Sequence, residues 1–153
     1  MGYFERDIHQ IAALPVFVTP YGGVDLCLVT ARGSGRWIIP KGNPIIGLAP
    51  HQVAEQEALE EAGLVGEVLP DCIGTFTFDR RQRSCAVDVY VLKVERQLPT
   101  WAEMAERTTL RCSAQVALRK ICSQGLAELI SGYLKVRLPP QQDDMQDTQP
   151  GFA

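Results

Sequence analysis

Several features that would mark a specialised class of protein are missing from this sequence of 153 residues. Its five cysteines are odd in number and none stands in a C-x-x-C pair, so neither a disulfide framework nor a cysteine zinc site is favoured. No run approaches the roughly 20 apolar residues of a membrane span, and the first residues, MGYFERDIHQ, are charged where a signal peptide is apolar. We therefore expect a cytoplasmic protein with reduced cysteines and no membrane partner.

An excess of basic residues is also missing, because the formal net charge is −3 at pH 7. Proteins that bind nucleic acids usually carry a basic stripe or patch, so we expect no nucleic-acid partner. The 46% hydrophobic and 22% charged residues are typical of a globular domain, which we place at residues 1–138. Residues 139–153, PPQQDDMQDTQPGFA, are polar and proline-rich, and we expect them to form a disordered tail.

Alternating apolar and polar residues predict strands on both sides of one long helix. AALPVFVT and VDLCLVTAR flank the turn PYGG, RWIIP follows, and CIGTFTF and SCAVDVYVLKV flank the charged turn DRRQR. A proline near its start and Gly63 at its end predict a helix over PHQVAEQEALEEA, residues 50–62. Further helices are expected at AQVALRKIC, capped by Ser113, and at LAELISGYL. The order indicates an α+β fold with helices covering a mixed sheet.

The long helix contains EQEALEEAG, which has four carboxylates and no Lys or Arg. At about 100° per residue, one face of this helix carries three acids: Glu57, Glu60 and Glu61. The neighbouring stripe consists of small residues that would pack closely on a sheet, with Leu59 extending this buried side: Ala54, Ala58 and Ala62.

Two interpretations of the acidic face are open on the residues alone. Like charges three or four positions apart cost roughly 0.2–0.5 kcal/mol per pair, and a solvated face tolerates that cost. Alternatively, a divalent cation relieves the repulsion, because Mg²⁺ commonly binds one or two carboxylates together with substrate phosphate oxygens.

The segment GNPIIGLAPHQVAEQEALEEAGL, residues 42–64, resembles the Nudix box, G-x5-E-x7-R-E-U-x-E-E-x-G-U, where U is aliphatic. The preceding RWIIPKG is similar to the branch with diadenosine-polyphosphate and diphosphoinositol-polyphosphate hydrolases. Two positions depart from the box: Leu48 stands for its first Glu and Gln56 for its Arg, which in the family helps to hold the helix acids in place. The resemblance implies a Nudix α/β/α sandwich with a mixed β-sheet between helices.

The resemblance also implies metal-dependent hydrolysis of a phosphoanhydride bond in a nucleoside diphosphate derivative, with Mg²⁺ or Mn²⁺ as cofactor. The expected substrate is a small-molecule polyphosphate, most closely a dinucleoside polyphosphate or a diphosphoinositol polyphosphate. The family's catalytic positions fall on Glu57, Glu60 and Glu61, and these acids together with the carbonyl of Gly42 would hold the metal. A further acid outside the box is expected among three residues, of which we prefer the last: Asp88, Glu103 and Glu106.

Arg36 and Lys41 bracket WIIP and are expected to bind the substrate's phosphates, although Arg36 is also explained as an exposed hairpin residue. We expect a monomer or a homodimer. The alternative function is a catalytically weak Nudix-fold module that binds nucleotides or regulates. Leu48 and Gln56 favour this alternative, whereas the three retained glutamates favour the enzyme.

Overall fold

The structure is a computed structural model that describes residues 8–140, so most of the tail predicted from residue 139 lies outside the described residues. In chain order the elements are β1 Ile8–Val18, β2 Val24–Thr30, β3 Trp37–Ile38, β4 Lys41–Gly42, α1 Pro50–Ala62, β5 Leu64–Arg80, β6 Arg83–Gln97, β7 Thr109–Ser113, α2 Ala114–Lys120 and α3 Gln124–Leu134.

The strands form one mixed sheet in the order β3-β2-β1-β6-β5, with β4 paired to β1 and β7 paired to β2. β1 and β6 run parallel, and the other pairs are antiparallel. In the β1–β4 pair, Ile11 lies opposite Gly42 and Ala12 lies opposite Lys41. The sheet therefore presents Lys41 and Gly42 to opposite faces, because successive residues of a strand alternate.

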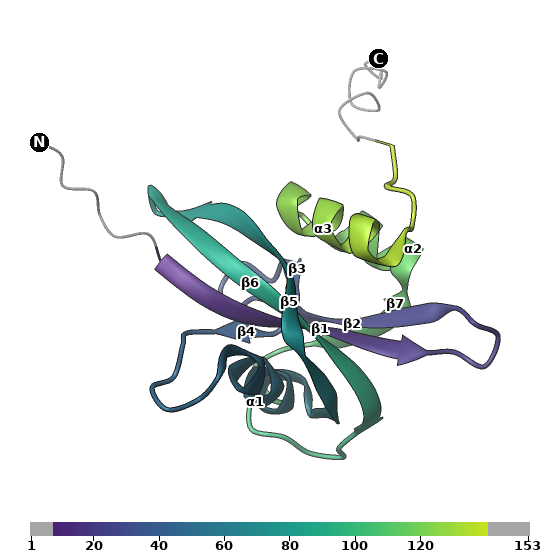
Figure 1. The fold of residues 1–153 in the computed structure, drawn as a ribbon, viewed down its shortest axis with the longest axis horizontal. Helices are drawn as coiled ribbons and strands as arrows, with labels where there is room; N and C mark the ends of the chain where they lie inside the picture. The colour runs from purple at the N-terminus through teal and green to yellow at the C-terminus, as the bar shows by residue number, and fades with distance from the viewer. Residues whose placement is uncertain (1–7, 141–153) are drawn as a thin grey trace, which may run out of the picture.

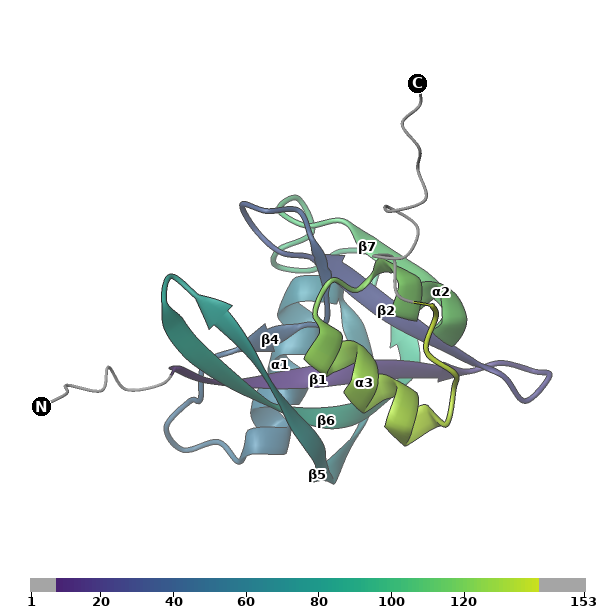
Figure 2. The same ribbon diagram turned by 90° about the horizontal axis from the view of Figure 1, so that it is seen from above.

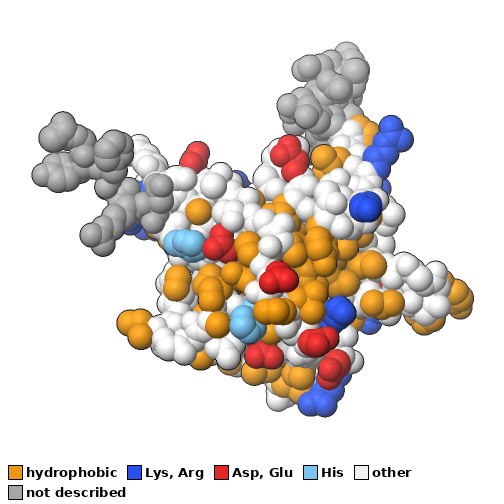
Figure 3. All heavy atoms as spheres, viewed as in Figure 1, with side chains coloured by type: hydrophobic (Ala, Val, Ile, Leu, Met, Phe, Trp, Pro, Cys, Tyr) orange, Lys and Arg blue, Asp and Glu red, His pale blue; other side chains and the backbone are white. Residues whose placement is uncertain are grey.

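Helices cover both faces of the sheet, with α1 on one side and α2 and α3 on the other (Figures 1 and 2). Each face has its own hydrophobic core: Ile11 and Ala13 pack on the α1 side, whereas Ala12 and Leu14 pack on the side of α2 and α3. Figure 3 shows hydrophobic side chains gathered over β5 between α1 and α3. The predicted α+β fold, an α/β/α sandwich with a mixed β-sheet between helices, is confirmed.

The long helix begins and ends as the sequence predicts. Pro50 occupies its first position, and Gly63 caps its end with a left-handed backbone at φ 66°. The alanine stripe Ala54, Ala58 and Ala62 is fully buried. Leu59 does not extend this buried side, since it is 40% exposed, which corrects the expectation. The alanines and Val53, which is 1% exposed, fill the contact of the helix with the sheet, and Leu59 lies outside it.

The second predicted hairpin is longer than its alternating segment. β5 starts at Leu64, directly after the helix cap, rather than at Cys72. Its register against β6 shifts at several points between Val65 and Gly74, and such bulges break the alternation that marks a strand in sequence.

Within residues 8–140, no helix is long and apolar enough to cross a membrane.

Candidate active site

The end of β4 meets the acidic face of α1 at Gly42. A Cβ atom on Gly42 would lie 2.5 and 2.6 Å from the two carboxylate oxygens of Glu57, so a side chain at this position would displace the carboxylate. Glycine therefore lets the backbone of β4 approach the helix acids closely. This contact brings together two residues that the Nudix resemblance assigns to one metal site.

Glu61 is the most deeply buried acid of the helix, with only 2% of its surface exposed. Its Oε1 has no hydrogen-bond partner among the described residues, and its Oε2 lies 3.7 Å from Nη2 of Arg107. Burial, followed by the adjoining carboxyl of Glu57, raises the pKa of Glu61 to about 8. Burial also raises the pKa of Glu57. Two neighbouring carboxyls are thus held where they compete for a proton or a cation.

Glu60 is half-buried and contacts the residue that replaces the box arginine. The side-chain Nε2 of Gln56 donates to Oε1 of Glu60 over 2.9 Å, one helical turn away. Both departures from the box, Leu48 and Gln56, border the same open hollow beside Glu60. A neutral amide therefore supports Glu60 from the helix, without the charge that an arginine would bring.

The loop between β6 and β7, which carries the candidate acids Glu103 and Glu106, is bonded to the end of α1. The indole Nε1 of Trp101 donates to the carbonyl of Glu61 over 3.2 Å, and the backbone N–H of Glu103 donates to the carbonyl of Glu60 over 2.9 Å. The Trp101 ring also packs directly against Gly63. These bonds satisfy carbonyls that the end of a helix leaves unpaired, and they fix the loop beside the acids.

Arg107 extends from this loop into the site, and its side chain is only 10% exposed. Its Nε donates to Oε1 of Glu103 over 2.8 Å, and its Nη1 donates to the carbonyl of Thr30 over 3.0 Å. The third nitrogen of its fork faces Glu61. Sequence reasoning missed Arg107, because no local motif links it to α1.

The acids outside the box have different surroundings. Glu106 is 48% exposed and pairs with Arg32 at 3.1 Å, away from the helix acids. Glu103 is 16% exposed, and its charge raises the pKa of both Glu57 and Glu61, so it lies nearer to them. Arg32 pairs with both acids, so the geometry favours Glu103 over Glu106 because Glu103 is the more buried of the two and its backbone is bonded to Glu60.

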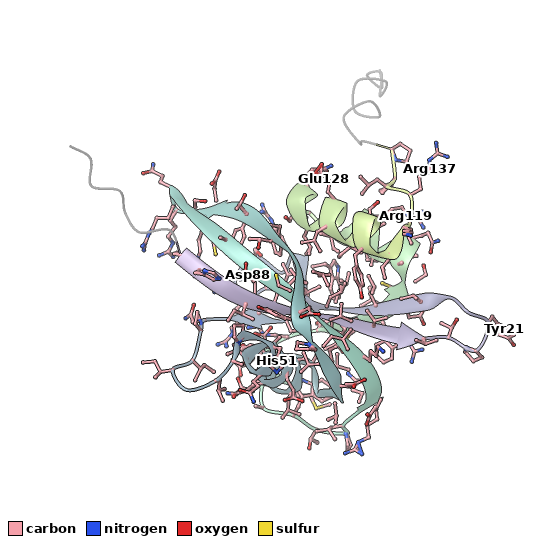
Figure 4. All side chains as sticks on the ribbon, in the orientation of Figure 1. Tyr21, His51, Asp88, Arg119, Glu128 and Arg137 are labelled. Atoms are coloured by element: carbon pink, nitrogen blue, oxygen red, sulfur yellow. The ribbon has the colours of Figure 1, made fainter. Side chains whose placement is uncertain are left out.

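Asp88, another acid outside the box, lies in β6 on the sheet, apart from the helix α1 that carries His51 (Figure 4). The carboxylate of Asp88 is bonded to Nε2 of His9 at 2.9 Å and to the hydroxyl of Thr75 at 2.6 Å. These cross-strand bonds occupy both carboxylate oxygens of Asp88.

The residues predicted to bind phosphate lie in different places. Lys41 is half-buried, donates from Nζ to Oε1 of Gln10 over 2.8 Å and stands over the ring of Phe78. Burial lowers the pKa of Lys41. The negative charge of Glu61 raises this pKa, so the carboxylate attracts the ammonium electrostatically. Arg36 is exposed in the connection between β2 and β3, where its backbone is hydrogen-bonded to Ser34 and Ala31.

The donor set fits a divalent cation, although the acids are not yet arranged around one. Within the described part of the chain, no three His, Cys, Asp or Glu side chains already form a metal-binding group. However, Glu61 has a buried carboxylate oxygen without a hydrogen-bond partner among the described residues. Gly42 has no side chain, so the backbone of β4 lies close to the carboxylate of Glu57. Hard cations such as Mg²⁺ prefer such oxygen ligands.

Comparisons with known proteins agree with this geometry. The chain is 24% identical over 121 residues to Nudix hydrolase 16, mitochondrial, from Arabidopsis thaliana, covering 73% of this chain and 67% of that protein. It superposes on a C. elegans Ap4A hydrolase in a binary complex with a TM-score of 0.70 at 18% identity, over 84% of this chain and 98% of the other. No protein-family model matches the chain.

A second solved structure is the Nudix domain of Shewanella oneidensis NrtR complexed with ADP ribose, with a TM-score of 0.66 at 12% identity over 88% of this chain and 91% of that one. The solved structures establish the fold, and the sequence relative is a Nudix hydrolase. The predicted resemblance to Nudix hydrolases and the enzyme class are thereby confirmed.

Proposed function

We propose that this Nudix hydrolase uses Mg²⁺ or Mn²⁺ to hydrolyse a phosphoanhydride bond in a nucleoside diphosphate derivative, most closely a dinucleoside polyphosphate or a diphosphoinositol polyphosphate. One observation carries the proposal: Gly42 lies directly against the carboxylate of Glu57, and the neighbouring Glu61 is buried with a carboxylate oxygen that has no hydrogen-bond partner among the described residues. A solvated acidic face does not account for an acid that is 2% exposed.

The residues divide the work as follows. Glu57, Glu61 and the carbonyl of Gly42 would hold the cation, with Glu60 as a further ligand or as the group that positions water. When bound, such a cation lowers the pKa of water and neutralises charge on phosphate oxygens. Burial strengthens these interactions, since charges act on one another more strongly away from bulk water.

Lys41 is proposed to contact a substrate phosphate. Its ammonium has donor capacity beyond the bond to Gln10, and the charge of Glu61 reaches it across the sheet. Arg36, exposed between β2 and β3, is proposed as an outer contact for a long polyphosphate chain.

Glu103 replaces Glu106 in the proposal as the acid outside the box. Its backbone is bonded to Glu60, and its charge acts on both Glu57 and Glu61. Glu106 pairs with Arg32 at the surface.

The cytoplasmic location and the monomeric or homodimeric state stay predictions. In the described residues every cysteine is free, which is compatible with a reducing compartment.

The choice of substrate is supported by the fold match to an Ap4A hydrolase and by the RWIIPKG segment before the box. The alternative is a module that binds a nucleotide without efficient hydrolysis. The ADP ribose complex of the NrtR domain and the bond that turns Glu60 towards Gln56 favour this alternative.

A hydrolysis panel separates the two functions. The purified protein is incubated with diadenosine polyphosphates, diphosphoinositol polyphosphates, nucleotide sugars and nucleoside triphosphates, with Mg²⁺ or with EDTA, and products are resolved by chromatography. The proposal predicts Mg²⁺-dependent cleavage that E61Q abolishes and E55Q keeps, since Glu55 is an exposed acid of the same helix. Binding of a nucleotide without cleavage by the wild type would establish the alternative.

A further inference from the structure

We infer that Arg107 is the positioning residue for Glu61, supplying from a loop the cationic support that the Nudix box places on the helix and that Gln56 does not provide. The inference rests on the proposed function of the α1 acids. Arg107 lies 51 positions beyond Gln56 in the chain, so a motif confined to the helix would not include it.

The fork of Arg107 is held in place before it reaches Glu61. Nη1 is bonded to the carbonyl of Thr30 at 3.0 Å, and Nε to Glu103 at 2.8 Å, so two of its donors are anchored at opposite sides. Nη2 is left pointing at Oε2 of Glu61, 3.7 Å away. An arginine fixed by two bonds keeps its third donor in one direction, which a flexible lysine would not do.

The loop that carries Arg107 is itself tied to the acids it serves. Trp101 is bonded to the carbonyl of Glu61, and the N–H of Glu103 to the carbonyl of Glu60. Any movement of the last turn of α1 therefore moves the loop as well. The bonds of Trp101 and Glu103 to the end of α1 therefore hold Arg107 near Glu61, in addition to the direct contact between the two side chains.

Helix and loop then support different acids. Gln56 bonds Glu60 at 2.9 Å, whereas Arg107 faces Glu61. A purely structural role, in which Arg107 only joins Thr30 to Glu103, predicts a loss of stability without a specific effect on metal binding or turnover. A positioning role predicts both effects, because partners that orient ligands typically change metal affinity or activity about 10–100-fold.

The test compares R107M with R32M. Arg32 also pairs with Glu103, at 3.0 Å, but it is 58% exposed, and its ion pairs among the described residues are with loop acids rather than with the acids of α1. At saturating substrate and Mg²⁺, R107M should lower kcat about 10–100-fold with KM nearly unchanged, while R32M should stay within about three-fold of the wild type. R107K, which keeps the charge without the fork, should lie between them. Equal kcat values for R107M and R32M would overturn the inference.

Mn²⁺ affinity, measured by calorimetry on the substrate-free protein, gives a second readout. R107M should bind Mn²⁺ about ten-fold more weakly than R32M, because Glu61 loses the partner that orients it. This comparison decides on Arg107 even if the wild type cleaves nothing in the panel, which would refute the proposed function alone. Unchanged Mn²⁺ affinity in a folded R107M would contradict the positioning role.

Epistasis with Gln56 tests the replacement itself. Q56R should raise kcat in the R107M background by a larger factor than it changes kcat in the wild type, where Arg107 already faces Glu61. The same effect of Q56R in both backgrounds would show that the two positions act independently, and would refute the replacement.

Discussion

Neutralising Glu61 should make the metal-free protein more stable at alkaline pH, and the effect can be worked out from its burial. The pKa of Glu61 is raised from its ordinary value of 4.5 to about 8. Between these values the folded protein keeps a proton that the unfolded chain releases. Stability should therefore be highest below pH 4.5 and fall as the pH rises towards 8, with a slope of up to about 1.4 kcal/mol per pH unit.

E61Q removes this proton equilibrium while keeping the shape of the side chain. Its free energy of unfolding should match the wild type near pH 5 and exceed it at pH 8 by a few kcal/mol, on the order of 3–5 kcal/mol. A smaller slope should remain, because burial raises the pKa of Glu57 as well. The sign is opposite to that of a carboxylate stabilised by an ion pair.

Urea denaturation at several pH values in EDTA measures the difference. E55Q is the matched control, since Glu55 lies on the same helix but is exposed, and its curve should run parallel to the wild type. If the E61Q curve also runs parallel to the wild type between pH 5 and pH 8, Glu61 does not hold a proton in the folded state, and the electrostatic account of the site is wrong.

Three further outcomes follow from the site. Mg²⁺ or Mn²⁺ at 100 times its Kd should stabilise the wild type by about 2.7 kcal/mol in thermal or urea unfolding and leave E61Q nearly unchanged; an equal gain in both would place the metal elsewhere. G42A should lower turnover at least ten-fold, because a Cβ atom would lie 2.5 Å from Oε1 of Glu57. G132A is the control for the substitution itself, since a Cβ atom at Gly132 would meet no atom within 4 Å. Full activity of G42A would refute the close approach. K41M should raise KM about ten-fold or more with a smaller change in kcat, as expected for a contact to a ground-state phosphate, and steady-state kinetics with an unchanged KM would remove Lys41 from the substrate site.

Local sequence signals predicted the framework of the site well. Pro50 and Gly63 mark the helix ends, and the spacing of Ala54, Ala58 and Ala62 indicates the face that packs on the sheet. These signals act through neighbouring residues, so they can be recognised without the fold. Leu59 shows the limit, because Val53 and the alanines make the contact with the sheet without it.

The surroundings of the acids could not be predicted in the same way. Arg107 and Trp101 reach α1 from a loop about 40 residues downstream, and their contacts with Glu61 depend on how β5 and β6 return the chain to the helix. The proposed preference for Glu103 over Glu106 has the same origin. Both acids lie in one loop, and only the fold shows that Glu103 is buried and bonded to the end of α1, whereas Glu106 is 48% exposed.

The most direct test of the central claim, that the acids of α1 form a divalent-metal centre, is diffraction from crystals grown with Mn²⁺ at a wavelength where manganese scatters anomalously. The account predicts an anomalous peak in contact with the carboxylates of Glu57 and Glu61, near the carbonyl of Gly42, and its loss in E61Q. Manganese peaks only elsewhere on the protein, or no peak at Mn²⁺ concentrations that support hydrolysis, would contradict the claim.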